Sequence, residues 1–420
     1  MKIVVSSRGS RGDVMPILSI GTHLAAAGHE VLACVPRALT DSAQDMGLTH
    51  VLYDEDIYHA MQSFEAKWTA AKRALAWMAS NLDHQFQVLM AASQGAQAIV
   101  SSVNELMAPS VAEYRGIPHF RVGYAPIIPG TQPPPLQPFQ TLPGWANLVA
   151  WRIVNGTVDL AFGRNVNRLR QSLGMKSIDR IETYLAARSL TLLGISPTLG
   201  PPGDRWRYPY EYVGYCFGGD HGSIDQRTEA FLNAGAPPLY VGFGSVGVRD
   251  PQALTKKVIE AADKVGCRLL IGRGWTGMGA DHLPDWASVV AETPHAVLFP
   301  KLAGIVHHAG SGTLHNAARA GIPQLGMPQI ADQYYWAHRI WRLGLGPKPI
   351  EPDHVTVDGL AAAMDSLLHN GYHQKMATRI ARQIRSDGAQ VAADRILNRL
   401  GASRDTSRRQ ATDERRTLAV

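Results

Sequence analysis

The segment GIVHHAGSGT, residues 304–313, decides the fold that we expect for this chain. It begins with a short apolar strand, Gly304–His308, and after a turn of small residues a helix is expected over Thr313–Ala320. A helix N-terminus offers free N–H groups and a partial positive charge, and small residues let a phosphate approach the backbone. The segment therefore indicates an anion site at the end of a strand, although an ordinary turn capped by Thr313 fits the same residues.

Strands and helices alternate on both sides of this segment, which predicts parallel sheets covered by helices on both faces. The first half starts with the strand Ile3–Ser6 and the helix Val14–Ala27, and a helical hairpin is expected near Leu148–Leu173. We therefore expect two doubly wound α/β domains, in which ligands bind beyond the carboxyl ends of the strands. In the second half the further expected elements are Leu239–Gly242, Pro251–Val265, Arg268–Ile271 and Gln324–Met327.

The length of 420 residues suits two domains. We place the first domain at residues 1–220, the second at 221–401 and a disordered tail at 402–420, and we expect the last helix to return to the first domain. The prolines between Pro126 and Pro143 exclude a regular helix or central strand there. With its apolar neighbours up to Trp145, this stretch is either a binding loop or a surface crossover.

Composition excludes several classes of protein. The net charge of +6 is compatible with an anionic ligand or a membrane surface but is too weak to indicate nucleic acid. The three cysteines, Cys34, Cys216 and Cys267, are far apart, so neither a disulfide framework nor a zinc site is indicated and a reducing, cytoplasmic location is the default. The apolar run at the N-terminus is too short for a signal peptide, and no run reaches the length of a membrane span.

Two further segments of the second half carry polar groups at strand ends. Asp332 and Gln333 together offer donors and acceptors that can bind sugar hydroxyls, although Asp332 could instead cap a helix. The glycines of Gly242–Gly247 formally match a dinucleotide-binding turn, for which Glu260 or Asp263 would bind the ribose. We favour a loop through which the backbone and Ser245 approach a phosphate. Trp275 is a candidate to flank a nucleobase, or a core residue.

Asp13 lies where the first strand passes into the first helix. A carboxylate there can accept a proton from an acceptor hydroxyl when proton transfer accompanies bond formation. It is ionised at neutral pH unless its surroundings raise its pKa. An N-cap aspartate, with Pro16 in the first helical turn, fits the residues equally well.

In combination these segments resemble the family 1 glycosyltransferases of the GT-B fold. The similarity is to the branch that contains sterol glucosyltransferases, glycopeptide-antibiotic glycosyltransferases and rhamnolipid-type enzymes. It rests on Gly9–Pro16, Gly242–Ser245, the His-His-x-Gly-x-Gly-Thr segment and Asp332-Gln333, and it extends to about Leu400. Ala309 and Ser311 depart from the family, which more often has Gly and Ala there. The stretch Ile99–Ser102 lacks the acid that supports a histidine base in plant-type relatives.

The resemblance implies an inverting transferase that uses no metal and no bound cofactor. The donor would be a UDP- or dTDP-linked hexose, and the acceptor a hydroxyl of an apolar sterol, lipid, polyketide or other natural product. A nicotinamide-dependent oxidoreductase and a non-catalytic nucleotide-sugar or lipid-binding module are the alternatives, and peripheral contact with a membrane and the oligomeric state are left open. Asp13 would be the base, and the donor would be bound by Gly12, Gly244, Ser245, Trp275, His295, His308, Gly310, Ser311, Gly312, Thr313, Asp332 and Gln333.

Overall fold

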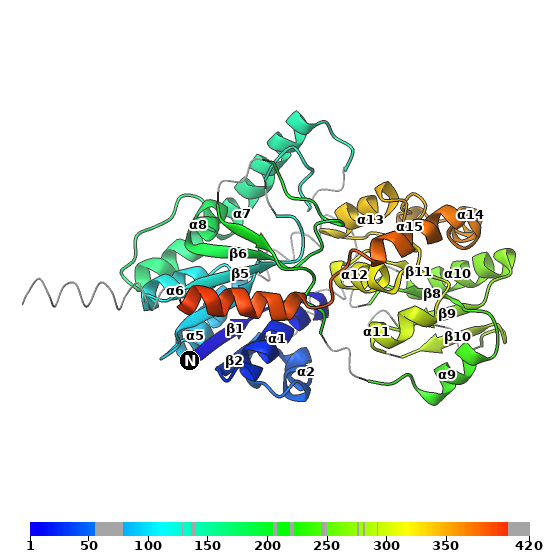
Figure 1. Ribbon diagram of the computed structural model, residues 1–420. Helices are drawn as coiled ribbons and strands as arrows, with labels where there is room; N and C mark the ends of the chain where they lie inside the picture. The colour runs from blue at the N-terminus through cyan, green and yellow to red at the C-terminus, as the bar shows by residue number, and fades with distance from the viewer. Residues whose placement is uncertain are drawn as a thin grey trace, which may run out of the picture.

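The structure, a computed structural model, consists of two α/β units that lie side by side, each built on a parallel sheet (Figure 1). It describes residues 1–54, 79–127, 129–135, 140–204, 208–218, 222–244, 248, 250–274, 277–279, 282–291 and 293–401.

The first unit contains a seven-stranded sheet in the order β3-β2-β1-β4-β5-β6-β7, and all of its neighbouring strands are parallel. Residues of β1 and β4 are buried on both faces because helices cover both sides of the sheet. The strands are β1 (Lys2–Ser6), β2 (Glu30–Pro36), β3 (Thr49–Asp54), β4 (Ala98–Ser102), β5 (His119–Gly123), β6 (Ser189–Leu193) and β7 (Tyr210–Tyr212).

The helices of the first unit include one that differs from the expected hairpin. The long helix α7 runs without a break over 29 residues because it contains no proline and its two inner glycines are tolerated, so the prediction of a hairpin was wrong. Phe162, Val166 and Leu169 on its buried face pack into the core beneath it. The helices are α1 (Arg11–Ala26), α2 (Thr40–Asp45), α5 (Leu82–Ala92), α6 (Ala108–Arg115), α7 (Gly144–Ser172) and α8 (Ile181–Arg188).

The second unit contains a five-stranded parallel sheet in the order β10-β9-β8-β11-β12. The expected strand Leu239–Gly242 and helix Pro251–Val265 are confirmed, and the helix after the glycine-rich turn starts two residues earlier than expected. The elements are α9 (Gln226–Asn233), β8 (Leu239–Gly242), α10 (Pro251–Val265), β9 (Leu269–Gly272), β10 (Ala287–Val290), α11 (His295–Leu298), β11 (Gly304–His307), α12 (Ser311–Ala320), β12 (Gln324–Gly326), α13 (Gln333–Arg342), α14 (Val357–His369) and α15 (Gly371–Ala381).

The two units share buried surface. One apolar cluster combines Leu193 and Ile195 of the first unit with Leu314 and Trp336 of the second. A last helix, residues 388–401, leaves the second unit and packs against the core under β1, β2 and β4 (Figure 1). The predicted fold class, two Rossmann-like domains, is confirmed.

Candidate active site

Both sheets reverse their strand order at one place, between β1 and β4 in the first unit and between β8 and β11 in the second. At such a point the loops at the carboxyl ends of the two central strands diverge and leave a crevice for a ligand. Asp13 and Asn104 follow β1 and β4, whereas Gly244 and His308 follow β8 and β11. The candidate residues of each unit therefore converge because of the topology of the sheets.

Asp13 is the third residue of α1, and Ser10 holds the N-cap position, so the alternative of an N-cap aspartate was wrong. The Asp13 Oδ2 atom accepts hydrogen bonds from the Ser10 backbone N–H at 2.9 Å and from the Ser10 hydroxyl at 3.0 Å. Burial raises the pKa of the Asp13 carboxyl above its ordinary value, although these hydrogen bonds oppose the rise. The carboxylate is thus a stronger base than an exposed aspartate and is held in one orientation.

Asn104 is a residue of this site that the sequence did not reveal. Its amide donates a hydrogen bond to Asp13 Oδ1 at 3.1 Å, and its backbone carbonyl accepts one from Arg8 Nε at 2.8 Å. The buried Arg8 guanidinium also lowers the pKa of Asp13 by its charge. The end of strand β4, Ile99–Ser102, has no acid to support a base. An asparagine two residues beyond the strand takes this place.

The two adjacent histidines have different surroundings. His307 Nδ1 accepts the Ala309 N–H at 3.1 Å, so the neutral ring donates from Nε2 to Gln324 Oε1, 3.1 Å away. Burial lowers the pKa of His307 well below its ordinary value, and both of its nitrogens serve the fold.

His308 is the histidine with a nitrogen to offer to a ligand. Its Nδ1 atom is buried without a hydrogen-bond partner in the described part of the chain. Burial lowers the pKa of His308 to about 4, so the ring is neutral at pH 7 and can donate one hydrogen bond. Glycines make room for it: a Cβ at Gly244 would lie 3.3 Å from His308 Cε1, and one at Gly310 would collide with Nε2.

The N-terminus of α12 lies directly after this histidine. Gly310 is its N-cap residue and provides no side chain to bind the free N–H groups of the first turn, Ser311–Thr313. Ala309 has a φ of 62°, a left-handed conformation that suits the glycine more common in the family. A Cβ at Gly312 would lie 2.8 Å from the Tyr215 hydroxyl, so a larger residue there would displace this side chain. The turn presents backbone donors to an anion.

Asp332 occupies the N-cap position of α13, but its side chain forms no cap hydrogen bond. Its Oδ2 atom instead accepts the Trp336 Nε1–H at 2.9 Å. Burial, with a smaller contribution from the charge of Asp13, raises the pKa of Asp332 to about 6. The carboxylates of the two units therefore lie within electrostatic reach of each other.

Gln333 offers less to a sugar than expected. Its Oε1 atom accepts the backbone N–H groups of Gln329 and Ile330 at 2.9 and 3.2 Å, and thereby holds the loop before α13. Only its Nε2 atom is left to donate to a ligand hydroxyl.

The remaining predicted positions are less closely defined. Gly12 is exposed in the first turn of α1, and His295 begins α11, where its ring stacks on Phe299 at 4.2 Å. Ser245 and Trp275 lie outside the described residues. The described residues include no group of three His, Cys, Asp or Glu side chains that could hold a metal ion.

The dinucleotide-binding alternative does not fit the local geometry. That motif requires a helix that opens within the glycine turn. Here α10 begins at Pro251, and the Asp250 side chain caps it by accepting the Ala253 N–H at 2.9 Å. The helix therefore starts beyond Gly247.

Comparison with known families identifies both halves of the chain. Residues 3–129 match the glycosyltransferase family 28 N-terminal domain, and residues 269–397 match the C-terminal domain of erythromycin biosynthesis protein CIII-like proteins. Among solved structures, a glycosyltransferase of kitacinnamycin aligns over 95% of this chain and 98% of its own, with a TM-score of 0.75 and 19% identity. The calicheamicin glycosyltransferase CalG4 aligns over the same shares, with a TM-score of 0.71 and 18% identity.

Fold and sequence together define a glycosyltransferase of the GT-B class. Within this class the chain belongs to the family of the vancomycin aglycone glucosyltransferase of Amycolatopsis orientalis, with 31% identity over 97% of this chain and 99% of that protein. Glycosyltransferase GtfC of the same organism is 32% identical over 95% of this chain and 97% of its own length. The sterol 3-beta-glucosyltransferase of Yarrowia lipolytica is 28% identical over 93% of this chain, which spans 28% of that longer protein.

Proposed function

We propose that the protein transfers a hexose from a UDP- or dTDP-sugar to a hydroxyl of an apolar natural product or sterol, with inversion at the anomeric carbon and without a bound metal. One observation carries the proposal: hydrogen bonds from Ser10 and Asn104 orient the Asp13 carboxylate on one unit, and the Trp336 indole orients the Asp332 carboxylate on the other. A base and a sugar-binding carboxylate on opposite sides of the site suit a direct transfer between two substrates.

The donor side is supported by the second unit. The α12 N-terminus and His308 can donate hydrogen bonds to a diphosphate and stabilise its charge as it departs, the role that a metal serves elsewhere. Structural relatives such as VinC and the spinosyn rhamnosyltransferase were solved with thymidine diphosphates. Asp332 would accept sugar hydroxyls, and the Gln333 amide would donate to one.

The chemistry follows from the position of Asp13. The acceptor hydroxyl gives its proton to the Asp13 carboxylate while its oxygen bonds to the anomeric carbon. The bond from that carbon to the diphosphate oxygen breaks on the opposite face, and the diphosphate leaves with the electron pair. A single displacement of this kind inverts the anomeric centre. The raised pKa of Asp13 makes its carboxylate a better proton acceptor.

The acceptor is proposed to contact the proline-rich stretch of the first unit. Its described part is fixed to α7, because Asn147 donates to the Thr131 carbonyl at 2.9 Å and Trp151 Nε1 donates to the Gln132 carbonyl at 3.0 Å. The Asp204 carboxylate accepts from Thr131 N and Oγ1 at 2.8 and 2.9 Å. A loop anchored in this way can present an ordered surface. The relatives named above act on a vancomycin aglycone and on sterols, both bulky acceptors.

The first test replaces the base. Asp13→Asn retains acceptors for Ser10 but cannot take a proton, so we expect transfer to fall by at least about a hundredfold. Affinity for the nucleoside diphosphate should stay within a factor of about two. Full turnover in this variant would contradict the assignment of the base.

The second test concerns the donor diphosphate. Thermal shifts with UDP, dTDP and NAD⁺ should show stabilisation by one of the first two and none by NAD⁺. His308→Ala should weaken binding of that nucleotide roughly tenfold, since one hydrogen bond to a charged group is lost. His369→Ala, which removes an exposed histidine on α14, is the matched control. Equal affinities of the two variants by calorimetry would refute the role of His308.

A further inference from the structure

Most of the exposed large apolar side chains of the described residues lie in one short segment. Trp145, Val149, Ile153 and Leu160 on α7 are 72%, 46%, 64% and 86% exposed. Leu142, directly before the helix, is also exposed. Elsewhere in the described part of the chain only Tyr114 and Tyr372 belong to this class. We call the four side chains of α7 the α7 ridge.

The α7 ridge lies on the side of the helix that faces away from the protein. At 3.6 residues per turn the four ridge positions fall on one face, roughly opposite the buried positions Trp151, Phe162 and Leu169. One face of α7 thus packs into the first unit, and the opposite face leaves apolar side chains in water. Residues 145–160 extend over about 22 Å at 1.5 Å per residue. The N-terminal part of the helix rises at the top of the molecule (Figure 1).

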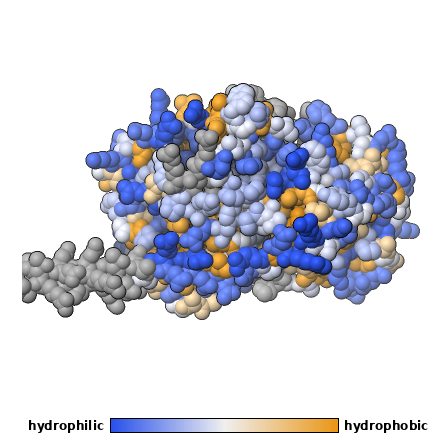
Figure 2. Space-filling model, turned by 45° about the horizontal axis from the view of Figure 1, so that its top comes forward, coloured by the Kyte–Doolittle hydropathy of each residue, from blue (hydrophilic) through white to orange (hydrophobic). Residues whose placement is uncertain are grey.

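Positive charges border the ridge. On the helix surface Arg152 lies at one edge of the ridge and Arg164 at the other, and both are exposed. Figure 2 is turned so that the top of the molecule in Figure 1 comes forward. On this face, apolar patches lie between hydrophilic side chains. The ridge therefore combines an apolar stripe with cationic edges.

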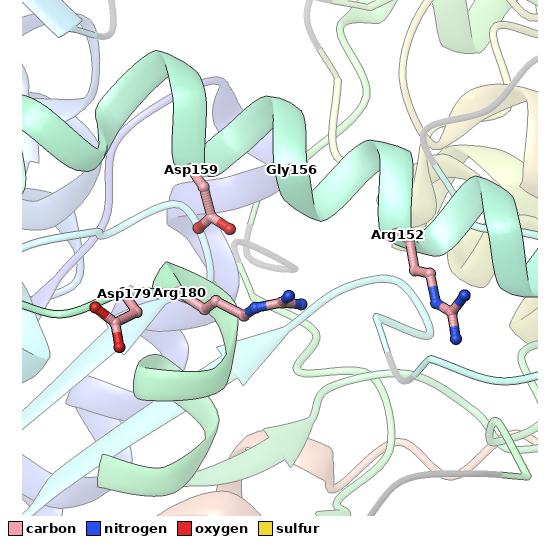
Figure 3. Close-up of a pocket in the computed structure, with 5 residues that line it drawn as sticks. All are labelled: Arg152, Gly156, Asp159, Asp179 and Arg180. Carbon is pink, nitrogen blue, oxygen red and sulfur yellow. The ribbon is translucent and has the colours of Figure 1, made fainter.

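A surface cavity of about 700 Å³ adjoins the Arg152 edge, between α7 and the residues before α8. Arg152 and Arg180 extend their guanidinium groups toward its open space (Figure 3). Two carboxylates also line this cavity. Asp159 accepts a hydrogen bond from the Ile181 N–H at 2.8 Å, and Asp179 is exposed. None of the residues proposed for transfer lines this cavity, so it is separate from the active site.

We propose that the α7 ridge docks the protein on an anionic phospholipid bilayer, with Arg152, Arg164 and Arg180 next to the lipid phosphates. An apolar stripe with a tryptophan and arginine edges is the pattern of a helix that lies in the membrane interface. No described helix has the length and hydropathy to cross a membrane, so contact would be peripheral.

The test is sedimentation of the full chain with vesicles of phosphatidylcholine alone or mixed with phosphatidylglycerol. The protein should bind the anionic vesicles, more weakly at high salt. Trp145→Ser combined with Ile153→Ser should reduce the partition coefficient at least tenfold. Arg152→Glu combined with Arg164→Glu should reduce binding to the anionic vesicles. Tyr114→Ser, which removes an exposed aromatic on α6, should leave the partition coefficient unchanged.

A second readout separates the ridge from residues 402–420, where five arginines outnumber three acidic residues and which all variants share. Brominated lipids should quench part of the tryptophan emission, and Trp145→Phe should lose that part. Any of three results would overturn the proposal. The first is that the protein does not bind the vesicles, the second is that the ridge variants bind them as well as the unmodified protein does, and the third is a dimer in gel filtration that the ridge variants dissociate. The inference is independent of the proposed reaction, since none of these measurements requires turnover. Unchanged affinity for the nucleoside diphosphate would confirm that the variants are folded.

Discussion

At the scale of single residues, opposing effects set the pKa of Asp13. Burial raises this pKa, and three hydrogen bonds lower it. Two of these bonds come from Ser10 in its own helical turn. The third comes from Asn104, which is 91 residues away in sequence. Asn104 is therefore a candidate positioning residue that links the proposed base to the loop after β4.

The role of Asn104 predicts a change in pH dependence. Asn104→Ala removes a hydrogen bond that favours the ionised Asp13, so the pKa of Asp13 should rise and the acidic limb of the kcat/KM profile should move to higher pH. We expect a loss of roughly tenfold on the acidic side and much less at high pH. The backbone acceptor for Arg8 Nε is retained. Asn104→Asp, which adds a like charge, should move the limb in the same direction.

The measurement is the rate profile of the two variants beside the unmodified protein. A loss of equal size at every pH would indicate a structural role only.

At the scale of elements, α12 and α13 begin in different ways. Helix α12 starts at an uncapped glycine turn, which leaves its N–H groups for an anion. Helix α13 starts after Asp332, whose carboxylate turns away from the backbone to the Trp336 indole. The helix thus lacks a side-chain cap, and a half-buried carboxylate lies at the junction of the two units.

Asp332→Asn should therefore stabilise the protein while it impairs transfer. The pKa of Asp332 is about 6 in the fold, above its ordinary value of 3.8, so the folded state favours the protonated form. The ionised group opposes folding above pH 6, and this penalty disappears as the pH falls from 6 toward 4. The neutral amide should raise the Tm by about 2 °C at pH 7.5. The gain should be clearly smaller at pH 4.5 and should vanish only below the ordinary pKa of 3.8.

Calorimetry at the two pH values, with kcat/KM measured at pH 7.5, tests this trade-off. A lower Tm at pH 7.5, or a gain of the same size at both pH values, would contradict it. Unchanged kcat/KM would remove Asp332 from the sugar site.

At the scale of the whole molecule, buried polar contacts fix one unit against the other. His315 on α12 accepts the Ser196 N–H at 3.1 Å and stacks on Tyr215 at 4.5 Å. Arg339 on α13 donates from Nε to the Leu199 carbonyl at 2.7 Å. Because α12 and α13 also carry the groups proposed to bind the donor, the same helices would form both the site and the junction.

Arg339→Met tests this coupling, since it keeps an apolar stem and removes the donors to the carbonyls of Leu199 and Thr198. Loss of partners for buried carbonyls costs about 1–3 kcal/mol. Calorimetric unfolding should start at lower temperature and separate toward two transitions. Arg342→Met, at an exposed position of the same helix, is the control. Identical unfolding curves of the two variants would show that the junction does not depend on Arg339.

Much of the fold could be predicted from the sequence because its signals are local. Apolar runs, glycine turns and the proline in α10 define strands and helix ends within a few residues, as Leu239–Gly242 and Pro251–Val265 demonstrate. The same local pattern placed His308 at a strand end and a helix N-terminus after it. It could not show that α7 is one helix, since two inner glycines suggest a break that packing overrides.

The sequence by itself determined the class of fold, the small-residue turn before α12 and the position of Asp13 between strand and helix. Only the tertiary structure decided that Asn104 supports this carboxylate, that His307 serves the fold while His308 keeps a nitrogen for a ligand, and that the α7 ridge faces outward. The reason is physical. Strand and helix formation depends on neighbours in the chain, whereas burial, pKa and pairing depend on which strand ends the sheet order brings together.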